Sequence, residues 1–460
     1  MAAMGTVVCL LGLLMLMQEV KGGQGLGNDG GDLWQEFLRL PTENGGTKWA
    51  LLIAGSSGYD NYRHQADVCH AYQIMKKGGL KDQNIVVMMY DDIAYNPKNP
   101  RKGVIINKPN GGNVYAGVPK DYKGKDVNKN NFLAVLLGKK SALTGAGSGK
   151  VISSGPNDHV FVYYSDHGGP GVLSMPSGEG LYANELVQAL KKKRAGGAFL
   201  NLVVYLEACE SGSIFEGLLP SNIGVYAMTA SNKTESSWAT YCNTPGYTTC
   251  LGDLFSVAWM EDADPRRPGD RQTLAQLYTI VKKRTTSSQV KLYGDLRLAS
   301  QPVSLYYLPP GPGITSTASG AILTDDEEGR RGGGVDQRDA GLVYLWREYY
   351  EEKSVEAWER ILREMERRSR LDTSVDLIVG DLLSSKAQLL QVRAGQPLVD
   401  DWDCLKSMVR TFEAHCGPLG QYGMKHTRAF ANMCNAALDH HHMAKAASKA
   451  CTMHPPLITY

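Results

Sequence analysis

Apolar residues gather along the chain in short, nearly continuous runs rich in β-branched and aromatic side chains. These runs cover residues 49–54, 85–90, 160–164, 202–206 and 225–228. A strand covered on both faces carries such a run, because neither of its faces meets water. We therefore predict that these segments are buried strands.

Segments with a helical pattern lie between several of these runs, at 63–77, 184–193 and 251–260. Strands that alternate with helices indicate a mostly parallel sheet with right-handed crossovers and helices on both faces. The predicted fold class is therefore α/β. A further apolar run, 303–308, is expected to close one edge of the sheet.

The composition changes at residues 311–340, which are rich in Gly, Ser, Thr, Asp, Glu and Arg and poor in apolar residues. This predicts a flexible linker that is open to proteases. Beyond it, apolar residues at helical spacing predict an amphipathic helix: Trp346, Tyr350, Trp358, Ile361, Leu362 and Met365. The remaining tail, 375–460, is expected to form a small all-helical domain.

Composition and charge bound the classes of function. With 460 residues, of which 43% are hydrophobic and 21% charged, the chain is long enough for two or three domains. The net charge is +2, from 49 basic and 47 acidic residues. This balance gives no electrostatic case for nucleic acid or a membrane surface as a partner.

The first residues resemble a targeting segment. An apolar run at 7–17 is followed by Lys21, Gly22 and Gly23, which predicts a signal peptide over residues 1–23. The run is shorter than the roughly 18 to 20 residues that a membrane-spanning helix needs. We therefore expect the secretory pathway, where disulfide bonds can form.

Nine cysteines are present, one of them, Cys9, in the predicted signal peptide. Cys242 and Cys250 lie close together, and Cys69 and Cys209 have no obvious neighbour. Four more gather near the end of the chain: Cys404, Cys416, Cys434 and Cys451. Four cysteines allow three sets of pairings, among which spacing does not choose.

Two further motifs concern modification and metals. The sequon at Asn232 predicts a glycan on the protein surface. His440, His441 and His442 are consecutive, and consecutive helical residues point in different directions, so they do not share one tetrahedral ion easily. We interpret them as a solvated helix end and predict no metal and no cofactor.

Two of the predicted strands end in residues that can perform covalent catalysis. The run 160–164 leads into Asp166, His167 and Gly168, and the run 202–206 leads into Glu207 and Cys209. If these strands are parallel neighbours, about 4.8 Å apart, His167 and Cys209 approach each other at the carboxyl edge of the sheet. A cysteine next to a base becomes a competent nucleophile.

Gly168 leaves room for a substrate carbonyl to reach backbone N–H groups, which with the N–H of Cys209 would form an oxyanion hole. Each residue also has a simpler interpretation when it is taken alone. A single cysteine at a strand end is typical of a small buried apolar residue, and a single histidine of a core residue. Together, at matching strand ends and followed by glycines, the two favour a catalytic pair.

Three stretches, 61–67, 163–168 and 205–213, resemble the legumain family, which is also known as asparaginyl endopeptidases or, in plants, vacuolar processing enzymes. The resemblance extends over residues 49–308, and the four-cysteine tail is similar to the family's prodomain. It implies these domains: an N-terminal propeptide at 24–47, a caspase-like catalytic domain at 48–310, a linker with an activation helix at 311–372, and a helical prodomain at 373–460.

The resemblance also implies roles for particular residues. Cys209 is then the nucleophile, His167 its acid/base partner, and Asn61 the residue that orients the site. The S1 pocket, which receives the side chain before the cleaved bond, is implied to consist of Arg63, Glu207, Ser236 and Asp253. Asp166 resembles a residue proposed to form a succinimide in relatives, although ordinary hydrogen bonding is the simpler interpretation.

The residue types of this pocket suit an amide. A guanidinium donates to the asparagine side-chain oxygen, and carboxylates accept from its N–H groups. Two structural interpretations compete with this one. Arg63 and Glu207 form an ion pair in the first, and Asp253, just after Gly252, is an ordinary helix N-cap in the second.

The resemblance implies three disulfide bonds: Cys242–Cys250, Cys404–Cys434 and Cys416–Cys451. It further implies that the prodomain inhibits the enzyme and is lost by self-cleavage in acid, in a vacuole or another acidic compartment. Protonated aspartic acid resembles asparagine, because a neutral carboxyl donates a hydrogen bond. The linker lacks Asn but contains Asp325, Asp326, Asp336 and Asp339, so we expect release to follow cleavage after Asp.

The predicted function is hydrolysis of proteins and peptides that expose Asn. A ligase that passes the same acyl group to an amine is a competing hypothesis. Pro170 and Cys242 look more like the hydrolases of the family, whereas Trp238 departs from the usual pattern. Two further hypotheses are a binding protein that has lost activity and a caspase-like enzyme selective for Asp.

Overall fold

The computed structural model describes residues 46–267, 270–308, 334–383 and 391–453. The predicted signal peptide, most of the N-terminal propeptide and residues 309–333 of the linker lie outside this part of the chain. Among the described residues, no helix combines the length and the apolar character that crossing a membrane would require.

A six-stranded sheet of described residues forms the centre of the first domain, in the order β11-β8-β7-β3-β1-β2. Its strands are β1 (Lys48–Ala54), β2 (Ile85–Met88), β3 (His159–Ser165), β7 (Asn201–Glu207), β8 (Val225–Thr229) and β11 (Lys291–Gly294). All pairs are parallel except β11–β8, which is antiparallel. The predicted strands and the predicted α/β class are confirmed.

The prediction for the sheet edge is wrong. Residues 303–308 do not pair with the sheet: they begin with a short 3-10 helix, Val303–Leu305, directly after Pro302. Their apolar character comes from packing, since Tyr307 contacts Phe161, Tyr205 and Trp259 beneath the sheet. The edge strand is β11 instead, which is short and only half-buried and therefore lacks a continuous apolar run.

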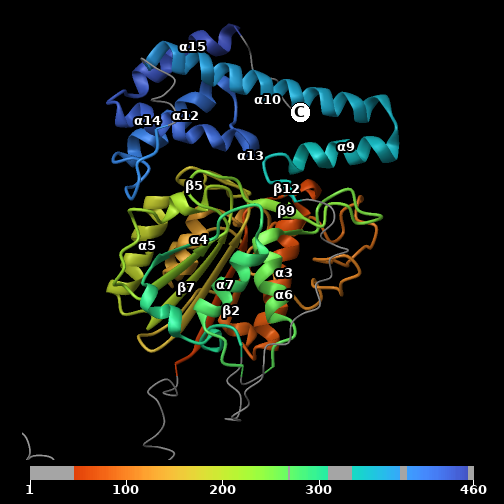
Figure 1. Cartoon of the computed structure of the whole chain (residues 1–460), viewed down its shortest axis with the longest axis vertical. Helices are drawn as coiled ribbons and strands as arrows, with labels where there is room; N and C mark the ends of the chain where they lie inside the picture. Colours follow the sequence, from red (N-terminus) through yellow and green to blue (C-terminus); the bar gives the residue numbers. More distant parts are fainter. Residues whose placement is uncertain (1–45, 268–269, 309–333, 384–390, 454–460) are drawn as a thin grey trace, which may run out of the picture. The chain divides into compact units, whose positions relative to one another are not determined.

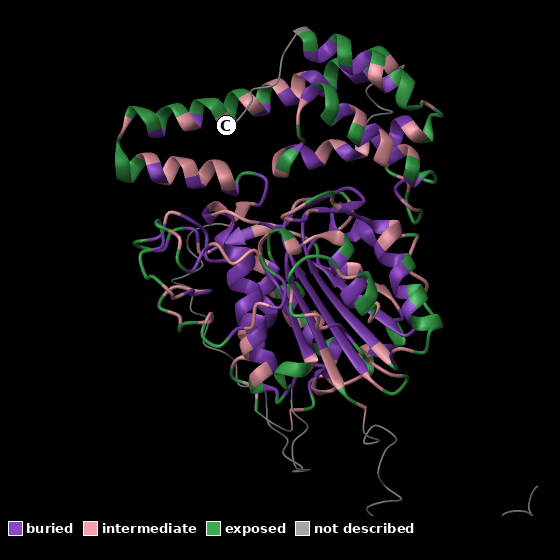
Figure 2. Ribbon diagram, turned by 180° about the vertical axis from the view of Figure 1, so that it is seen from behind, coloured by how far each residue is buried: buried purple, intermediate pink, exposed green. Residues whose placement is uncertain are grey.

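Helices cover both faces of the sheet (Figure 1). α4 (Lys129–Leu136) and α5 (Ala183–Ala195) pack on one face, and α3 (Tyr62–Lys77), α6 (Leu254–Ala263) and α7 (Leu274–Arg284) on the other. Alternation along each strand divides the core: Leu51 and Ile53 face one layer, and Ala50 and Leu52 the other. Figure 2 shows the strands almost entirely buried.

The amphipathic helix predicted after the linker is two helices, α9 (Ala340–Glu352) and α10 (Val355–Leu382). Lys353 adopts a left-handed conformation with φ 49°, and the Ser354 side chain accepts from the Ala357 N–H as the N-cap of α10. The spacing of the apolar residues continues across this break, so the pattern alone does not reveal it.

The tail is helical as expected, with α12 (Trp402–Cys416), α13 (Gly420–Gly423), α14 (Thr427–Asn435) and α15 (His440–Met453). The structure joins α12 to α14 through Cys404–Cys434 and to α15 through Cys416–Cys451. The three consecutive histidines lie at the exposed start of α15, where the Asp439 carboxylate accepts from the backbone N–H groups of His441 and His442.

Candidate active site

The parallel pairing of β3 with β7 aligns the two candidate catalytic segments. Ser165 and Glu207 are the last residues of the two strands and lie opposite each other. His167 comes two residues after Ser165, and Cys209 comes two residues after Glu207. The two segments are in contact, since a Cβ at Gly168 would lie 2.8 Å from the Cys209 carbonyl oxygen. A glycine is therefore required here for the close approach.

Cys209 is almost fully buried, at 1% exposure. Burial raises the pKa of its thiol to about 12, although the Arg338 guanidinium acts in the opposite direction. Burial also holds the pKa of His167 well below its ordinary value. Both groups are therefore neutral in this form of the protein, in which the site is covered.

Asn61 contacts His167 directly. The Asn61 Nδ2 donates to the Ser57 carbonyl oxygen at 2.9 Å, so its Oδ1 is the acceptor for the N–H at His167 Nε2, 2.7 Å away. Arg63 Nη2, which can only donate, also lies 3.4 Å from His167 Nε2, but the contact with Asn61 is much shorter. The shorter contact favours a neutral imidazole with its proton on Nε2 and a lone pair on Nδ1. The contact agrees with the orienting role expected of Asn61.

His64 is a site residue that sequence reasoning missed, although it lies inside one of the stretches that carry the family resemblance. Its Nδ1 lies 2.7 Å from Ser56 Oγ and 2.9 Å from Asp166 Oδ1, and its ring packs edge-on against His167. Burial, with Arg63 nearby, lowers the pKa of His64 to about 3, so it is neutral.

His64, Asp166 and His167 bring possible metal-ligand atoms within 4.8 Å of one another. These atoms already face protein partners, because His64 Nδ1 meets Ser56 and Asp166, and His167 Nε2 meets Asn61. The contacts within the protein account for the cluster. Burial raises the pKa of Asp166, and its Oδ1 lies 2.9 Å from His64 Nδ1. Both interpretations of Asp166, the succinimide and ordinary hydrogen bonding, stay predictions.

Arg63 and Asp253 form the ion pair of the candidate S1 pocket. Arg63 Nε donates to Asp253 Oδ1 at 2.9 Å, and both side chains are fully buried. Asp253 occupies the N-cap position of α6 but makes no capping hydrogen bond with its side chain. The interpretation of Asp253 as an ordinary helix cap is therefore wrong, and the partner of Arg63 is Asp253 rather than Glu207.

The amide of Gln337 lies between Arg63 and Glu207. Its Oε1 accepts from Arg63 Nη2 at 3.1 Å, and its Nε2 donates to Glu207 Oε1 at 3.2 Å. Each polar end of the amide therefore meets a group of the opposite hydrogen-bonding character. The composition around Gln337 predicts only a flexible linker, and no apolar pattern distinguishes this residue.

The backbone before Gln337 is held as a strand. β12 (Val335–Asp336) pairs antiparallel with β9 (Trp238–Thr240), and the Gln337 N–H donates to the Ser237 carbonyl oxygen at 3.1 Å. The expectation that all of 311–340 is an open linker is therefore wrong for residues 334–340. An added strand supplies backbone hydrogen bonds that a Gly-rich composition does not predict.

Glu207 is fully buried and is held by α6. Its Oε2 accepts from the backbone N–H and the hydroxyl of Ser256, each at 3.2 Å. Burial raises the pKa of Glu207, and the nearby Asp253 adds to this effect. Ser237, rather than the predicted Ser236, contributes contacts here: its hydroxyl lies 3.9 Å from Cys209 Sγ and bonds to Glu207. Ser236 is half-buried beside it.

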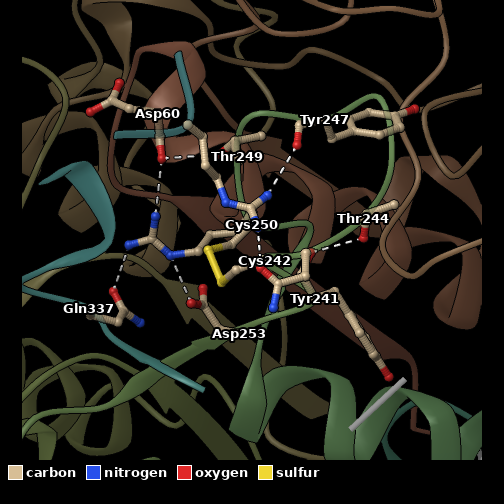
Figure 3. Close-up of a disulfide and its surroundings, with 12 residues drawn as sticks. Asp60, Tyr241, Cys242, Thr244, Tyr247, Thr249, Cys250, Asp253 and Gln337 are labelled. Carbon is tan, nitrogen blue, oxygen red and sulfur yellow. Dashed lines mark hydrogen bonds and ion pairs between the residues drawn. A yellow bond between two sulfur atoms is a disulfide. The ribbon is translucent and has the colours of Figure 1, made fainter. Parts of the chain in front are cut away.

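A disulfide closes the loop beside the pocket. Cys242 is joined to Cys250, and both pack against Ala239 of β9 and Ala340 at the start of α9. In the same loop, the Thr249 hydroxyl donates to the Asp60 carbonyl oxygen, which also accepts from Arg63 Nη1 (Figure 3). The disulfide loop therefore supports both Arg63 and the strand that holds Gln337.

Arg338 holds the segment 335–338 next to Cys209. Its guanidinium pairs with Glu210, the residue after Cys209, and donates to the Gly168 carbonyl oxygen at 3.2 Å. Its other terminal nitrogen donates to the Gln421 carbonyl oxygen of the tail at 3.1 Å. Thr427 of the tail also donates to the Pro170 carbonyl oxygen. Residues of the helical tail thus contact the loop that carries His167.

Asn232, the predicted glycan site, is half-buried, and its Oδ1 accepts from the Thr234 N–H and hydroxyl. It lines a surface hollow together with Glu216, Lys233 and Tyr293. Glycosylation of Asn232 stays a prediction.

Comparison with known proteins agrees with this arrangement. The model of the Peptidase C13 family matches residues 48–324, and the model of the legumain prodomain matches 359–451. The chain is 52% identical to a vacuolar-processing enzyme of Vicia sativa over 93% of each chain, and 50% identical to legumain of Canavalia ensiformis over 91% of this chain and 92% of the relative.

A solved structure of caspase-1 from Spodoptera frugiperda matches with a TM-score of 0.33 and 11% identity, over 60% of this chain and 96% of that one. The family matches and the curated relatives define a cysteine endopeptidase that carries its own prodomain. The chain belongs to the peptidase C13, or legumain, family. The boundaries that we assigned to its domains stay predictions.

The burial of Cys209 predicts a difference in thiol reactivity between the precursor and its acid-treated form. Iodoacetamide should modify Cys209 of the precursor slowly at neutral pH, because the thiol is covered and its pKa is raised. Removing the cover lowers that pKa, and each unit raises the thiolate fraction about tenfold. We expect at least that gain, measured by mass spectrometry of the alkylated peptide.

Cys69 is the internal control, since it is fully buried in the core beside Met89. Its labelling should stay negligible in both forms. Equal labelling of Cys209 before and after acid treatment would contradict the prediction.

Proposed function

We propose that this protein is an asparaginyl endopeptidase that hydrolyses peptide bonds after Asn, and after Asp in acid. It is made as a precursor and processes vacuolar proteins, as the names of the relatives from Vicia sativa and Citrus sinensis suggest for those enzymes. The observation that carries the proposal is the amide of Gln337 held between Arg63 and Glu207.

The contacts of Gln337 define what the pocket accepts. Arg63 supplies a donor and Glu207 an acceptor, which an asparagine amide satisfies at once. An aspartate carboxylate facing Glu207 would bring two like charges together, unless one of the two carries a proton. Binding of Asp therefore improves as the pH falls, whereas binding of Asn does not need this proton.

The proposed reaction follows from the tautomer of His167. Its Nδ1 takes the proton of the Cys209 thiol, and the sulfur attacks the carbonyl carbon of the residue in the pocket. The N–H groups of Gly168 and Cys209 stabilise the oxyanion that develops. The imidazolium then gives its proton to the leaving amine. Water, activated by the same imidazole, attacks the thioester and releases the acid product and the thiol.

Paired peptides test this specificity. We expect the acid-treated enzyme to cleave after Asn over a broad pH range, after Asp only in acid, and not after Ala, because Ala lacks the polar atoms that Arg63 and Glu207 require. Activity is measured by chromatography of peptides that differ at one residue, with Cys209→Ala as the inactive control. Equal cleavage after Ala, or cleavage that survives Cys209→Ala, would rule out the proposal.

Gln337 provides a second test within the precursor. Glutamine is one methylene longer than asparagine, so Gln337→Asn should draw the backbone toward the pocket. The blocking segment, residues 335–338, should then become a substrate. We expect Gln337→Asn to be cut after residue 337 at neutral pH, detected by mass spectrometry. Gln337→Ala is the matched control and should stay uncut there. An intact Gln337→Asn precursor, under conditions where Asn peptides are cleaved, would contradict this prediction.

Ion pairs between the helical tail and the catalytic domain support activation by acid. Arg410 of α12 pairs with Glu179 at 2.8 Å, and Lys406 of α12 pairs with Glu185 at 3.1 Å. A hydrogen bond from Lys129 lowers the pKa of Glu179 first, and Arg410 lowers it further. Lys129 belongs to the catalytic domain and stays with Glu179 after release, so only the lowering by Arg410 is linked to docking. That share stabilises docking while Glu179 is ionised, and it is lost as the pH falls through the lowered pKa of docked Glu179.

Glu210 acts in the opposite direction, because burial raises its pKa. Acid does not weaken docking through this group. The weakening comes instead from the partly exposed pairs on α12, and cleavage after Asp in the linker then makes the release permanent. Of the linker aspartates, Asp336 and Asp339 lie in the described part of the chain, and Asp325 and Asp326 lie outside it.

Replacing both basic residues tests this account of activation. In Lys406→Ala/Arg410→Ala, the tail should bind about two- to thirtyfold more weakly at neutral pH, from two pairs worth about 0.2–1 kcal/mol each. We expect the pH at which half of the precursor becomes active to rise. Lys449→Ala, which removes a pair with Asp381 inside the tail, is the matched control. An unchanged midpoint in the double variant would refute this role.

A further inference from the structure

Three carboxyl groups lie together behind the candidate S1 pocket with one guanidinium. Asp67, Asp253 and Glu207 are each 0% exposed, as are Arg63 and His64 beside them. His64 is neutral, because burial lowers its pKa to about 3. Three buried carboxylates facing a single positive charge would leave two uncompensated charges in the core, which is strongly unfavourable. A proton on any one of the carboxyls reduces this charge, and burial raises the pKa of both Asp67 and Glu207.

The hydrogen bonds around Asp67 fix which of its oxygens accepts. Asn107 Nδ2 donates to Asp67 Oδ1 at 2.7 Å and to the Leu251 carbonyl oxygen at 2.9 Å. A backbone carbonyl only accepts, so the orientation of the Asn107 amide is determined, and Asp67 Oδ1 receives a donor. Asn107 Oδ1 in turn faces His70 Nδ1 at 2.8 Å, as this orientation requires.

The other oxygen of Asp67 faces a second carboxyl. The Ser165 hydroxyl donates to Asp67 Oδ2 at 3.1 Å and also lies within donating distance of Asp253 Oδ2, at 3.4 Å. The Asp67 and Asp253 side chains are themselves in hydrogen-bonding contact, and a protonated oxygen can donate one hydrogen bond while it accepts another. Two carboxyl groups form a hydrogen bond only if one of them carries a proton. Asp253 Oδ1 is paired with Arg63, whereas the partners of Asp67 are the neutral groups Asn107 and Ser165 and the Asp253 carboxyl itself.

We propose that Asp67 is a positioning residue of the S1 pocket that keeps its proton at neutral pH and donates it, through Oδ2, to Asp253. Asp253 then holds Arg63 at the place where the guanidinium meets the substrate amide. This deepens the proposed function, on which it rests. Asp67 acts through Asp253 and Arg63 and does not touch the substrate.

The surroundings agree with a neutral Asp67. Burial raises its pKa well above the ordinary value, and the charges of Asp253 and Glu207 raise it further. The titratable and charged groups that face this cluster are Arg63, His64, Tyr163, Glu207 and Asp253. The one buried cation among them, Arg63, is bound to Asp253 rather than to Asp67.

An amide has the shape of a protonated carboxyl and offers the same donor and acceptor. Asp67→Asn should therefore keep kcat/KM for an Asn peptide within about threefold of the wild type, since the introduced amide would donate to Asp253 and accept from Asn107. Asp67→Ala leaves both partners unsatisfied and should lose about ten- to a hundredfold, chiefly through KM. Asp253→Asn, the matched control, removes the charge that holds Arg63 and should not be tolerated.

Two readouts separate this role from a merely structural one. In the wild type, KM should rise at alkaline pH as Asp67 loses its proton, and Asp67→Asn should abolish that rise. In the full precursor, the infrared band of a protonated carboxyl should be present at neutral pH and missing from Asp67→Asn. The infrared band is independent of which peptide is cleaved, so it tests Asp67 even if the proposed specificity fails.

An infrared difference without a carboxylic acid band would overturn the inference, and so would a tenfold or larger loss of kcat/KM in folded Asp67→Asn. Failure of Asp67→Asn to fold would overturn it as well, because an amide replaces a protonated acid without a change of shape or charge.

Discussion

The buried ion pair between Arg63 and Asp253 is the interaction on which the rest of the site depends. Arg63 extends from the first turn of α3, and Asp253 closes the short strand before α6, so the pair ties together two helices on the same face of the sheet. A buried charge is stable only when it is paired and hydrogen-bonded. That requirement gives the guanidinium one fixed direction, in which Nη2 donates to the Gln337 amide.

The precursor fills its candidate S1 pocket with its own chain. Gln337 satisfies Arg63 and Glu207, β12 pairs with β9, and Arg338 covers the segment that contains Cys209. Under the proposed function, inhibition depends on the same hydrogen bonds as substrate recognition. A mutation that weakens substrate binding in this pocket is expected to weaken the internal inhibitor as well, so the two properties cannot be tuned independently.

Much of the catalytic domain was predictable because buried strands leave a simple pattern. The runs that became β1, β3, β7 and β8 are continuous and apolar, and polar residues follow where they end. The pairing of Ser165 with Glu207 then brings His167 and Cys209 to one edge, as the sequence indicated.

Other features leave no such pattern. Gln337 and Val335 are ordered through backbone pairing with β9, which any sequence without proline can provide. The misassigned run 303–308 is apolar because Tyr306 and Tyr307 fill the core, and burial by packing looks the same in sequence as burial in a sheet. Ser237, rather than Ser236, contacts Glu207. Both residues directly precede β9, where successive side chains point to opposite sides, and the sequence does not show which of the two points inward.

The position of the blocking segment relative to the linker has a kinetic consequence. Gln337 and Arg338 follow residues 309–333, so a cut in that stretch leaves them attached to the helical tail. Before the cut, the blocking segment is tethered, and its effective concentration at the site is independent of dilution. After the cut, the same fragment becomes a separate ligand that obeys mass action. Cleaved enzyme at high concentration would therefore stay inhibited longer than cleaved enzyme at low concentration.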